Sequence, residues 1–302
     1  MSAKKVHKVD KRVGNTRIAL RNIMAATDFS AHSVSVLTHG AAIARRYRSK
    51  FYVAHVIPTD VYKSVPTEAM EEALKQTRAY VLDAMANQLR FEFLQAVQNE
   101  PVIKEGQVAP ELLKLVAERN IGLLVIGTRG HHGLDRLLQG SIAEEVFRQA
   151  PCPVLIVPPT ASEQSGIPVR TILYPTSFSE NSLRAAPYAF SLARRHRARL
   201  ILLHVSAESS INSQEDLVRL QAAGEERLRQ LLPTKGGPSR EPMVCVDFGA
   251  VEKKIVRVAV ENDADLIVLG IATAAAAAAH LAEGLTYKVV GAAPCPVLTI
   301  RG

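Results

Sequence analysis

Two copies of one pattern follow each other along this chain, and this repeat limits the possible folds more than any other feature. Three segments of the first copy recur in the second in the same order: NIMAATDFS and TILYPTSFS (22–30, 171–179), GLLVIG and DLIVLG (122–127, 265–270), and APCPVLIV and APCPVLTI (150–157, 293–300). The offset falls from 149 residues at the first pair to 143 at the other two. The second copy is therefore shorter, and the long helix predicted near 67–99 of the first copy is where a length change is most easily absorbed.

The repeat divides the chain into two domains of ordinary size. We expect a basic flexible tail at 1–16, a first domain at 17–159, a linker at 160–169 and a second domain at 170–302. The segment PPTASEQSGIPV at 158–169 is rich in Pro, Ser and Gly, which is typical of linkers.

Each copy alternates predicted strands with predicted helices. The strands of the first copy are apolar and β-branched, with little polar alternation, and fall near 21–27, 51–57, 102–107, 122–127 and 153–158. This pattern is typical of a parallel sheet covered by helices on both faces. The sequence therefore predicts an α/β fold of two tandem doubly wound domains, each with a five-stranded parallel sheet sandwiched by helices. In such sheets, ligands bind beyond the carboxyl ends of the strands.

Charge, apolar runs and cysteines narrow the functional classes. The net charge of +8 is concentrated at 1–21 and in the arginines of 194–199, but neither cluster has interleaved aromatic residues. We therefore favour a solvated tail and a charged helix end over a nucleic-acid site. No apolar run could span a membrane and no signal peptide is evident, so we expect a cytoplasmic protein. Cys152, Cys245 and Cys295 form no metal-like cluster, which predicts reduced, buried thiols.

A glycine-rich loop follows the fourth predicted strand of the first copy, with the sequence GTRGHHGLDRLLQGSI at 127–142. Gly127 and Gly130 permit positive φ and close backbone approach. Gly140 and Ser141 precede a predicted helix, whose free N–H groups and dipole suit an anion such as phosphate. The alternative is a capping box, in which Ser141 and the glutamate three residues later start the helix without any ligand.

The spacing Gly127-x-x-Gly130, nine residues, Gly140-Ser141 resembles the nucleotide-binding signature of the universal stress protein family. The ATDFS, AHV and PCPVLIV segments resemble that family in the same order, and the tandem arrangement resembles its two-domain members. The resemblance implies an adenine nucleotide alpha-hydrolase-like fold and an adenine nucleotide as ligand. The cofactor implied is ATP, with Mg²⁺ neutralising the phosphates.

The resemblance also implies which residues contact ATP. Ala26 and Thr27 would lie beside the nucleotide, Asp28 would contact the nucleoside, and Val56 would touch the adenine. The residues around the ribose and phosphates would be Gly127, Arg129, Gly130, Gly140, Ser141 and the backbone of Ile142. A carboxylate at a strand end can accept hydrogen bonds from a ribose hydroxyl or an adenine amine. The alternative for Asp28 is a cap for the following helix, with Ser30 as the rival cap.

Four histidines are candidates for other roles. His131 and His132, near Asp135, allow a catalytic or metal-binding interpretation, but exposed loop histidines are favoured. His55 and His204 occupy the same place in a strand of each copy, which predicts a shared structural role.

The second copy departs from the nucleotide-binding pattern. Ser177 stands where the first copy has Asp28, and Thr273 replaces the second loop glycine. Glu283 would bring negative charge to where phosphate should sit. The alanine run at 274–279 favours helix and offers no anion-binding side chain. We therefore expect one nucleotide per chain.

The last strand of each copy is apolar and, as an edge strand, needs a cover or a partner. The resemblance implies that the domains pair through it, giving an intrachain pseudo-dimer that could form a homodimer in turn. The function expected is that of an ATP-binding stress-response or signalling regulator. Two alternatives stay open: a slow ATPase or phosphotransferase, for which no convincing base or nucleophile is visible, and a nucleotide-independent interaction scaffold.

Overall fold

The computed structural model describes residues 18–62, 67–128, 142–159, 161, 169–206, 213–235, 237–272 and 284–301. The strands of its first half are β1 (Asn22–Ala26), β2 (Lys50–Pro58), β3 (Asn99–Gly106), β4 (Leu123–Gly127) and β5 (Val154–Val157). Those of the second half are β6 (Thr171–Pro175), β7 (Arg199–Ser206), β8 (Met243–Phe248), β9 (Leu266–Ile271) and β10 (Val297–Arg301).

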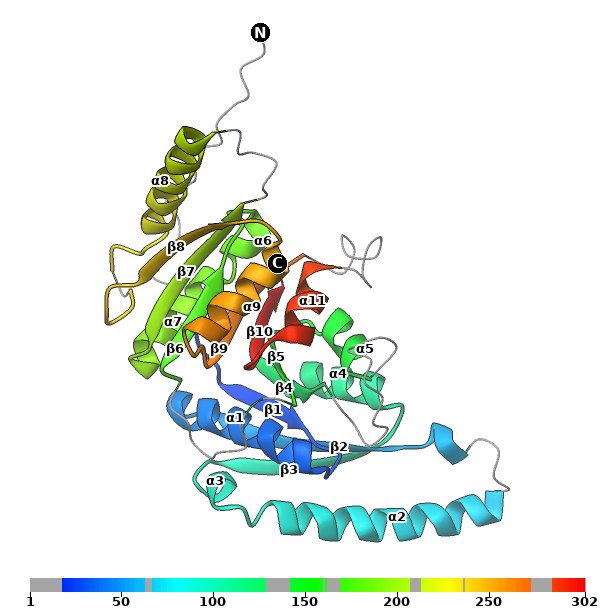
Figure 1. Ribbon diagram of the computed structural model, residues 1–302. Helices are drawn as coiled ribbons and strands as arrows, with labels where there is room; N and C mark the ends of the chain where they lie inside the picture. Colours follow the sequence, from blue (N-terminus) through cyan, green and yellow to red (C-terminus); the bar gives the residue numbers. More distant parts are fainter. Residues whose placement is uncertain are drawn as a thin grey trace.

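Helices alternate with these strands along the chain (Figure 1). The first half has α1 (Ala31–Tyr47), the short η1 (Asp60–Tyr62), α2 (Thr67–Gln88), α3 (Glu92–Gln95), α4 (Val108–Glu118) and α5 (Ile142–Gln149). The second half has α6 (Glu180–Leu183), α7 (Ala186–His196), α8 (Gln214–Gln230), α9 (Val251–Glu261) and α11 (Leu285–Ala292). The order of elements confirms the α/β fold predicted from the repeat.

The described strands form one sheet in the order β3-β2-β1-β4-β5-β10-β9-β6-β7-β8. Pairing is parallel within each half, whereas β5 and β10 pair antiparallel, with Leu155 opposite Leu298. The hydroxyl of Thr299 adds a hydrogen bond of 3.1 Å to the carbonyl oxygen of Val154. The last strands of the two copies therefore cover each other's edges, which confirms the expected pairing within the chain.

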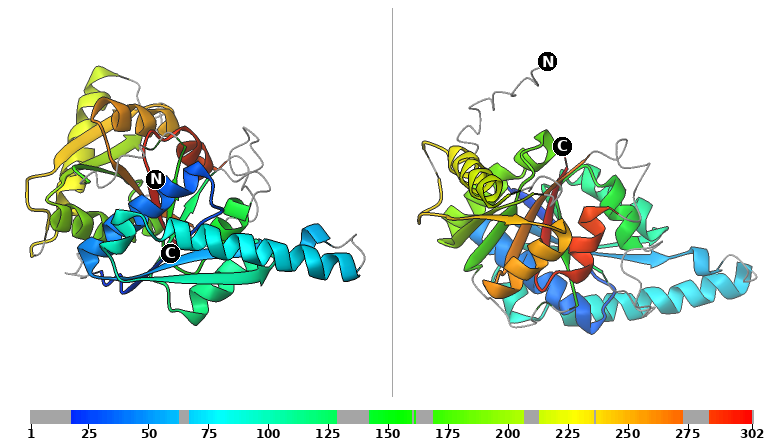
Figure 2. Two further views of the ribbon diagram at one scale, coloured as in Figure 1. Left: turned by 90° about the horizontal axis from the view of Figure 1, so that it is seen from below. Right: turned by 45° about the horizontal axis from the view of Figure 1, so that its top comes forward.

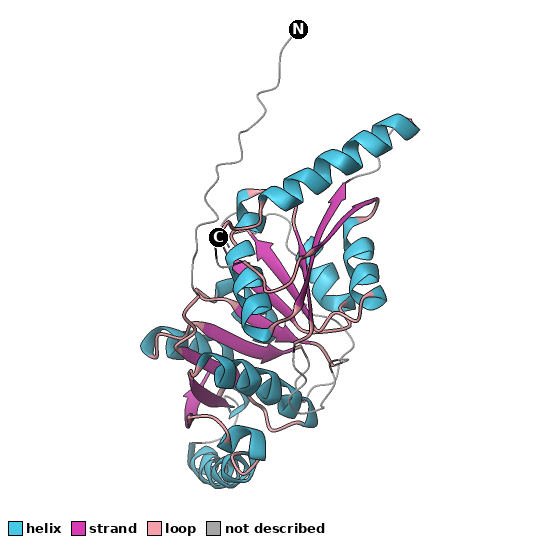
Figure 3. Cartoon of the chain, turned by 90° about the vertical axis from the view of Figure 1, so that its left-hand side faces the viewer, coloured by secondary structure: helices cyan, strands magenta, loops and turns pink. Residues whose placement is uncertain are grey.

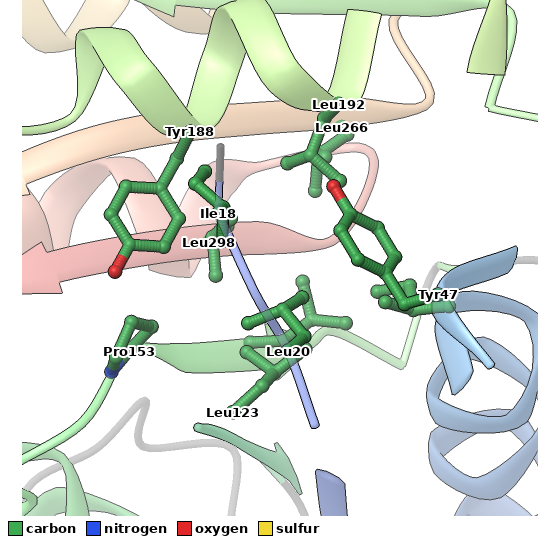
Figure 4. Close-up of a pocket in the computed structure, with 11 residues that line it drawn as sticks. Ile18, Leu20, Tyr47, Leu123, Pro153, Tyr188, Leu192, Leu266 and Leu298 are labelled. Atoms are coloured by element: carbon green, nitrogen blue, oxygen red, sulfur yellow. The ribbon is translucent and has the colours of Figure 1, made fainter. Parts of the chain in front are cut away.

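Helices cover both faces of this sheet (Figure 3). Successive strand residues point to opposite faces, so apolar strands present an apolar surface on each face that a layer of helices must bury. Ile23 and Ala25 of β1 belong to a core with α1, α3, α7 and α8, whereas Met24 belongs to a core with α4, α5, α9 and α11. Each core contains residues of both halves. A small cavity at the seam between the halves, lined by apolar side chains and two tyrosines, measures about 10 Å³, the room of roughly one water (Figure 4).

The long helix expected at 67–99 is shorter than predicted. It ends at Gln88, and the chain turns into α3 before β3 begins at Asn99. Leu94 of α3 is fully buried, so burying this side chain draws the chain back onto the sheet. The other end of α2 extends past the sheet (Figure 2).

The three cysteines are free thiols. Cys152 and Cys295 are buried, and burial raises the pKa of their thiols to about 11 and about 12. The expectation of a buried thiol is wrong for Cys245, which is half-buried because its strand, β8, lies at the sheet edge. Within the described ranges, no helix is long and apolar enough to cross a membrane.

Candidate functional site

The candidate site lies at the carboxyl edge of the first half, where the strand order reverses. β1 pairs with β2 on one side and with β4 on the other, all in parallel. The connection from β1 leads to β2 on one side, whereas the connection from β4 leads to β5 on the other, and a crevice at such a switch point is where ligands bind in doubly wound sheets. The segment that follows β1 and the end of β4 meet at this edge.

Asp28 lies in a tight turn between β1 and α1. Its Oδ1 accepts hydrogen bonds from the backbone N–H of Ser30 at 3.0 Å, from the Ser30 hydroxyl at 2.6 Å, and from the Ser33 hydroxyl. Ser30 is the helix N-cap, since its side chain accepts from the N–H of Ser33. Of the two candidate N-caps, Ser30 is therefore the cap. Asp28 stabilises the turn through its hydrogen bonds, and its carboxylate lies at the positive end of the α1 dipole.

The same turn is anchored to β2 by Thr27 and His55. The Nδ1–H of His55 donates to the carbonyl oxygen of Thr27 at 2.8 Å, and the Thr27 hydroxyl donates to Gln88 at 2.9 Å. Phe29 has a φ of 62° and packs its ring 4.5 Å from that of His55. These contacts hold a backbone conformation that phenylalanine rarely adopts.

His204 makes the equivalent contacts in the second half. It bonds the carbonyl oxygen of Thr176 at 2.9 Å and lies 4.6 Å from the ring of Phe178, whose φ is 60°. Burial lowers the pKa of His204, and the hydrogen bond to Thr176 opposes this. The shared structural role predicted for the two strand histidines is confirmed.

Gly127 ends β4 beneath a side chain that sequence reasoning missed. A Cβ at this position would lie 2.8 Å from the imidazole of His32 and 3.1 Å from Val36. The Nε2–H of His32 donates to the carbonyl oxygen of Val157 at 3.1 Å, so the ring lies across the ends of β4 and β5. The sequence could have indicated this residue, because His32 lies in the first turn of α1, and α1 begins at this edge.

Of the remaining residues predicted to contact ATP, the structure describes some and not others. Val56 is two residues beyond the pairing of Ala26 with Ala54, hence at the same edge, and its side chain is only 5% exposed. Ile142 begins α5 and is 50% exposed. The predicted residues that lie outside the described part of the chain are Arg129, Gly130, Gly140 and Ser141, together with His131, His132 and Asp135. Among described residues, no cluster of three or more His, Cys, Asp or Glu side chains could hold a metal ion.

The corresponding edge of the second half is covered by backbone. A Cβ on Gly270, the counterpart of Gly127, would overlap the carbonyl oxygen of Asn181 and lie 2.6 Å from the Cα of Ser182. Pro187, near the start of α7, has no N–H with which to continue a helix from α6. The single helix α1 is thus replaced by two pieces, and the first rests directly on β9.

Tyr174 holds this covering helix in place. Its hydroxyl donates to the carbonyl oxygen of Ser182 at 2.8 Å, and its buried ring meets Phe190 edge to face with centroids 6.3 Å apart. Burial raises the pKa of Tyr174 to about 12. Ala25 occupies this position in the first half, so the phenol and the closure it supports are particular to the second.

The turn after β6 keeps its shape without a carboxylate. Ser179 is the N-cap of α6 and accepts from the N–H of Ser182, as Ser30 does in the first half. The hydroxyl of Ser177 donates to that of Ser179 at 2.9 Å. Since Phe178 also has the same φ as Phe29, to within 2°, the turn does not depend on an acid at the position of Asp28.

Comparison with known proteins gives a consistent match to both halves. A model of the universal stress protein family matches residues 19–158 and 168–301. A universal stress protein of Methanocaldococcus jannaschii is 27% identical over 51% of this chain and 92% of its own. A homologue from Coxiella burnetii is 32% identical over 45% of this chain and 95% of its own.

Solved structures match as well. The crystal structure of a universal stress protein from Archaeoglobus fulgidus has a TM-score of 0.68 at 20% identity, covering 94% of this chain and 99% of that one. A universal stress protein solved in complex with cAMP covers 46% of this chain and 98% of its own, at 21% identity and a TM-score of 0.37.

Proposed function

Because the chain belongs to the universal stress protein family, we propose that its first half binds one ATP molecule and that this binding regulates a partner in a stress or signalling response. The observation that carries this proposal is the comparison of the two turns. The second half builds the same turn with Ser177 in place of Asp28. A carboxylate at the position of Asp28 is therefore not required for this turn conformation, which supports a ligand-binding role for Asp28.

The residues at this edge suit an adenine nucleotide. Asp28 would accept hydrogen bonds from the nucleoside, and its position is fixed in advance by the bonds from Ser30 and Ser33. The phosphates would be held by the glycine loop after Gly127 and by the start of α5, where free N–H groups favour anions. Mg²⁺ would neutralise phosphate charge, and it needs few protein ligands because it retains several waters.

The structure of the second half supports a stoichiometry of one nucleotide per chain. The α6 backbone rests on Gly270, whereas Gly127 of the first half is covered by the side chains of His32 and Val36. A side chain can rotate away from a ligand, whereas α6 is held by Tyr174 and separated from α7 at Pro187.

The test is to titrate ATP, ADP and AMP, with Mg²⁺, into the wild type and into Asp28→Ser. This substitution copies the second half's own residue, so it removes the carboxylate while keeping a side chain that the turn accepts. Losing a hydrogen bond to a charged group weakens binding by about 1.5–3 kcal/mol, or roughly 10- to 150-fold. Gly130→Val should also weaken binding.

The matched control is Ser177→Asp, which should leave the stoichiometry at one nucleotide. Equal affinity of Asp28→Ser and the wild type would refute the proposed role of Asp28, and absence of ATP binding by the wild type would refute the function. Sustained phosphate release that is lost in Ser141→Ala would show an ATPase instead.

A further inference from the structure

A groove of about 1310 Å³ opens where the carboxyl-terminal ends of α1 and α7 meet, against the seam between β5 and β10. Three arginines from each half line it: Arg45, Arg46, Arg48, Arg194, Arg195 and Arg197. We call it the arginine groove. It is separate from the candidate nucleotide site, because the two lie at opposite ends of α1. That helix has 17 residues, so its ends are about 25 Å apart.

Two of the six arginines hold the halves together. The guanidinium of Arg46 donates to the carbonyl oxygen of Arg195, and the guanidinium of Arg195 donates back to the carbonyl oxygen of Arg46 at 3.4 Å. Arg195 also lies over the ring of Tyr47, 4.3 Å from its centroid. Arg46 and Arg195 therefore have a structural role, and Arg194 and Arg195 are half-buried at the charged helix end that the sequence predicted.

Backbone N–H groups bond two carbonyls in the last turn of both α1 and α7. Arg48 and Arg197 adopt left-handed conformations, with φ of 56° and 54°, and their N–H groups bond the last turns of α1 and α7. These carbonyls therefore do not need the side chains of Arg45, Arg48, Arg194 and Arg197, and among the residues that the structure describes, none of those four side chains forms a hydrogen bond.

The groove carries strong positive charge. Within the described part of the chain, none of its six arginines forms an ion pair with a carboxylate. The acid among the described lining residues is Asp265, whose Oδ2 accepts from the N–H groups of Arg170 and Thr171 at 2.7 and 2.8 Å. By contrast, the exposed arginines elsewhere that pair with carboxylates include Arg78, Arg184, Arg219 and Arg229. In the described lining of the groove, six arginines thus face a single carboxylate, so the arginines repel one another and a bound anion would relieve this repulsion.

We propose that the arginine groove binds a short chain of phosphate groups, such as an inorganic oligophosphate. Guanidinium groups bind phosphate through paired, charge-assisted hydrogen bonds. Equivalent arginines approach from both halves, which suits a linear anion that presents the same charged group at each end. Among the described lining residues, Tyr47 is the one tyrosine, phenylalanine or tryptophan, and Arg195 lies over its ring, which leaves little aromatic surface for stacking successive bases. A phosphate chain is therefore favoured over nucleic acid.

His196 provides a probe inside the groove. Burial and the nearby charges of Arg46 and Arg195 lower its pKa to about 4. His39 also lines the groove, and burial lowers its pKa. The hydrogen bond to the Ser35 carbonyl raises that pKa, and the charge of His32 lowers it further. An anion that offsets the arginine charge should raise the pKa of His196.

The experiment is to titrate sodium tripolyphosphate into the full chain by calorimetry. The test variant carries Arg45→Gln, Arg48→Gln, Arg194→Gln and Arg197→Gln, leaving the two structural arginines intact. The control variant carries Arg78→Gln, Arg184→Gln, Arg219→Gln and Arg229→Gln, which removes the same charge at carboxylate-paired positions. Each groove arginine should contribute about fivefold to affinity, the equivalent of about 1 kcal/mol at 4 Å in water. The test variant should then bind at least about 100-fold more weakly, and the control less than about threefold.

NMR of the His196 ring supplies a second readout, with an upward pKa shift expected when wild type is saturated with tripolyphosphate. The double variant Arg45→Gln/Arg194→Gln replaces the fourfold variant if thermal unfolding shows that the latter is misfolded. Equal weakening of test and control variants, or no binding by the wild type, would overturn the proposal. Tighter binding of duplex DNA or single-stranded RNA than of tripolyphosphate, lost in the groove variant, would overturn it in favour of nucleic acid.

Discussion

Replacing Gly270 with alanine tests the claim that backbone closes the second half's carboxyl edge. The new Cβ would lie 2.6 Å from the Cα of Ser182, while carbon atoms prefer about 3.5–4.0 Å, so α6 must move by about 1 Å. This movement strains the bond from Tyr174 to Ser182. Overpacking costs about 1–3 kcal/mol and a hydrogen bond about 1 kcal/mol, so we expect a loss of about 3 kcal/mol in the free energy of unfolding.

Two other glycines make matched comparisons. In Gly127→Ala the Cβ meets the ring of His32, which can rotate away at the cost of its bond to Val157, or about 1 kcal/mol. In Gly237→Ala the nearest atoms belong to Pro233 at 3.5 Å, an ordinary contact, so stability should stay within about 0.5 kcal/mol or rise slightly.

The assay is urea unfolding followed by circular dichroism, with the midpoint and slope compared among the three variants. The chain contains no tryptophan, so tyrosine fluorescence supplies the second probe. If the halves unfold in separate steps, the Gly270→Ala effect should fall on the step of the second half. A Gly270→Ala protein as stable as Gly237→Ala would refute the conclusion that α6 backbone closes this edge.

Three further outcomes are expected. Tyr174→Phe should lower the free energy of unfolding by about 1–2 kcal/mol in urea titrations, because the buried carbonyl of Ser182 loses the hydrogen bond from the phenol and keeps the one from the N–H of Ala185. Stability should fall as the pH drops from about 6.5 to 4, because His196 has a pKa of about 4 when folded and about 6.5 when unfolded, so the unfolded chain binds the extra proton. In His196→Gln this contribution, at most about 3 kcal/mol, should disappear from the pH profile of unfolding, and an unchanged profile would count against it. Iodoacetamide at neutral pH should label Cys245 before the two buried cysteines, as mass spectrometry would show, since a half-buried thiol is the more accessible one.

Much of the fold could be predicted because it depends on local and periodic features. The apolar segments near 21–27 and 122–127 became β1 and β4 to within two residues, and the repeat placed their counterparts in the second half. The edge-strand argument predicted a cover or a partner for the last strand of each copy, and the family resemblance implied the pairing of β5 with β10. The end of the helix after residue 67 was missed, because burial of Leu94 against the sheet, rather than a local stop signal, ends it.

The candidate site was only partly accessible from sequence. Asp28 and Gly127 follow from the position of strand ends, since the carboxyl ends of parallel strands meet at one edge. His32 lies against Gly127 because α1 packs over β4, a relation that no spacing in the sequence reveals. Likewise, Pro187 indicates a break in a helix, but only its packing shows that the detached piece covers Gly270.

The sequence by itself determined the tandem architecture, the order of strands and helices, and the asymmetry between Asp28 and Ser177, because each depends on residue type and periodicity along the chain. Tertiary structure alone decided that arginines of the two copies line a common groove. Arg45 and Arg194 stand 149 residues apart and read separately as two charged helix ends. They line one groove because the antiparallel pairing of β5 with β10 brings the ends of α1 and α7 together. The interaction between charges depends on their separation in space, not on their separation along the sequence.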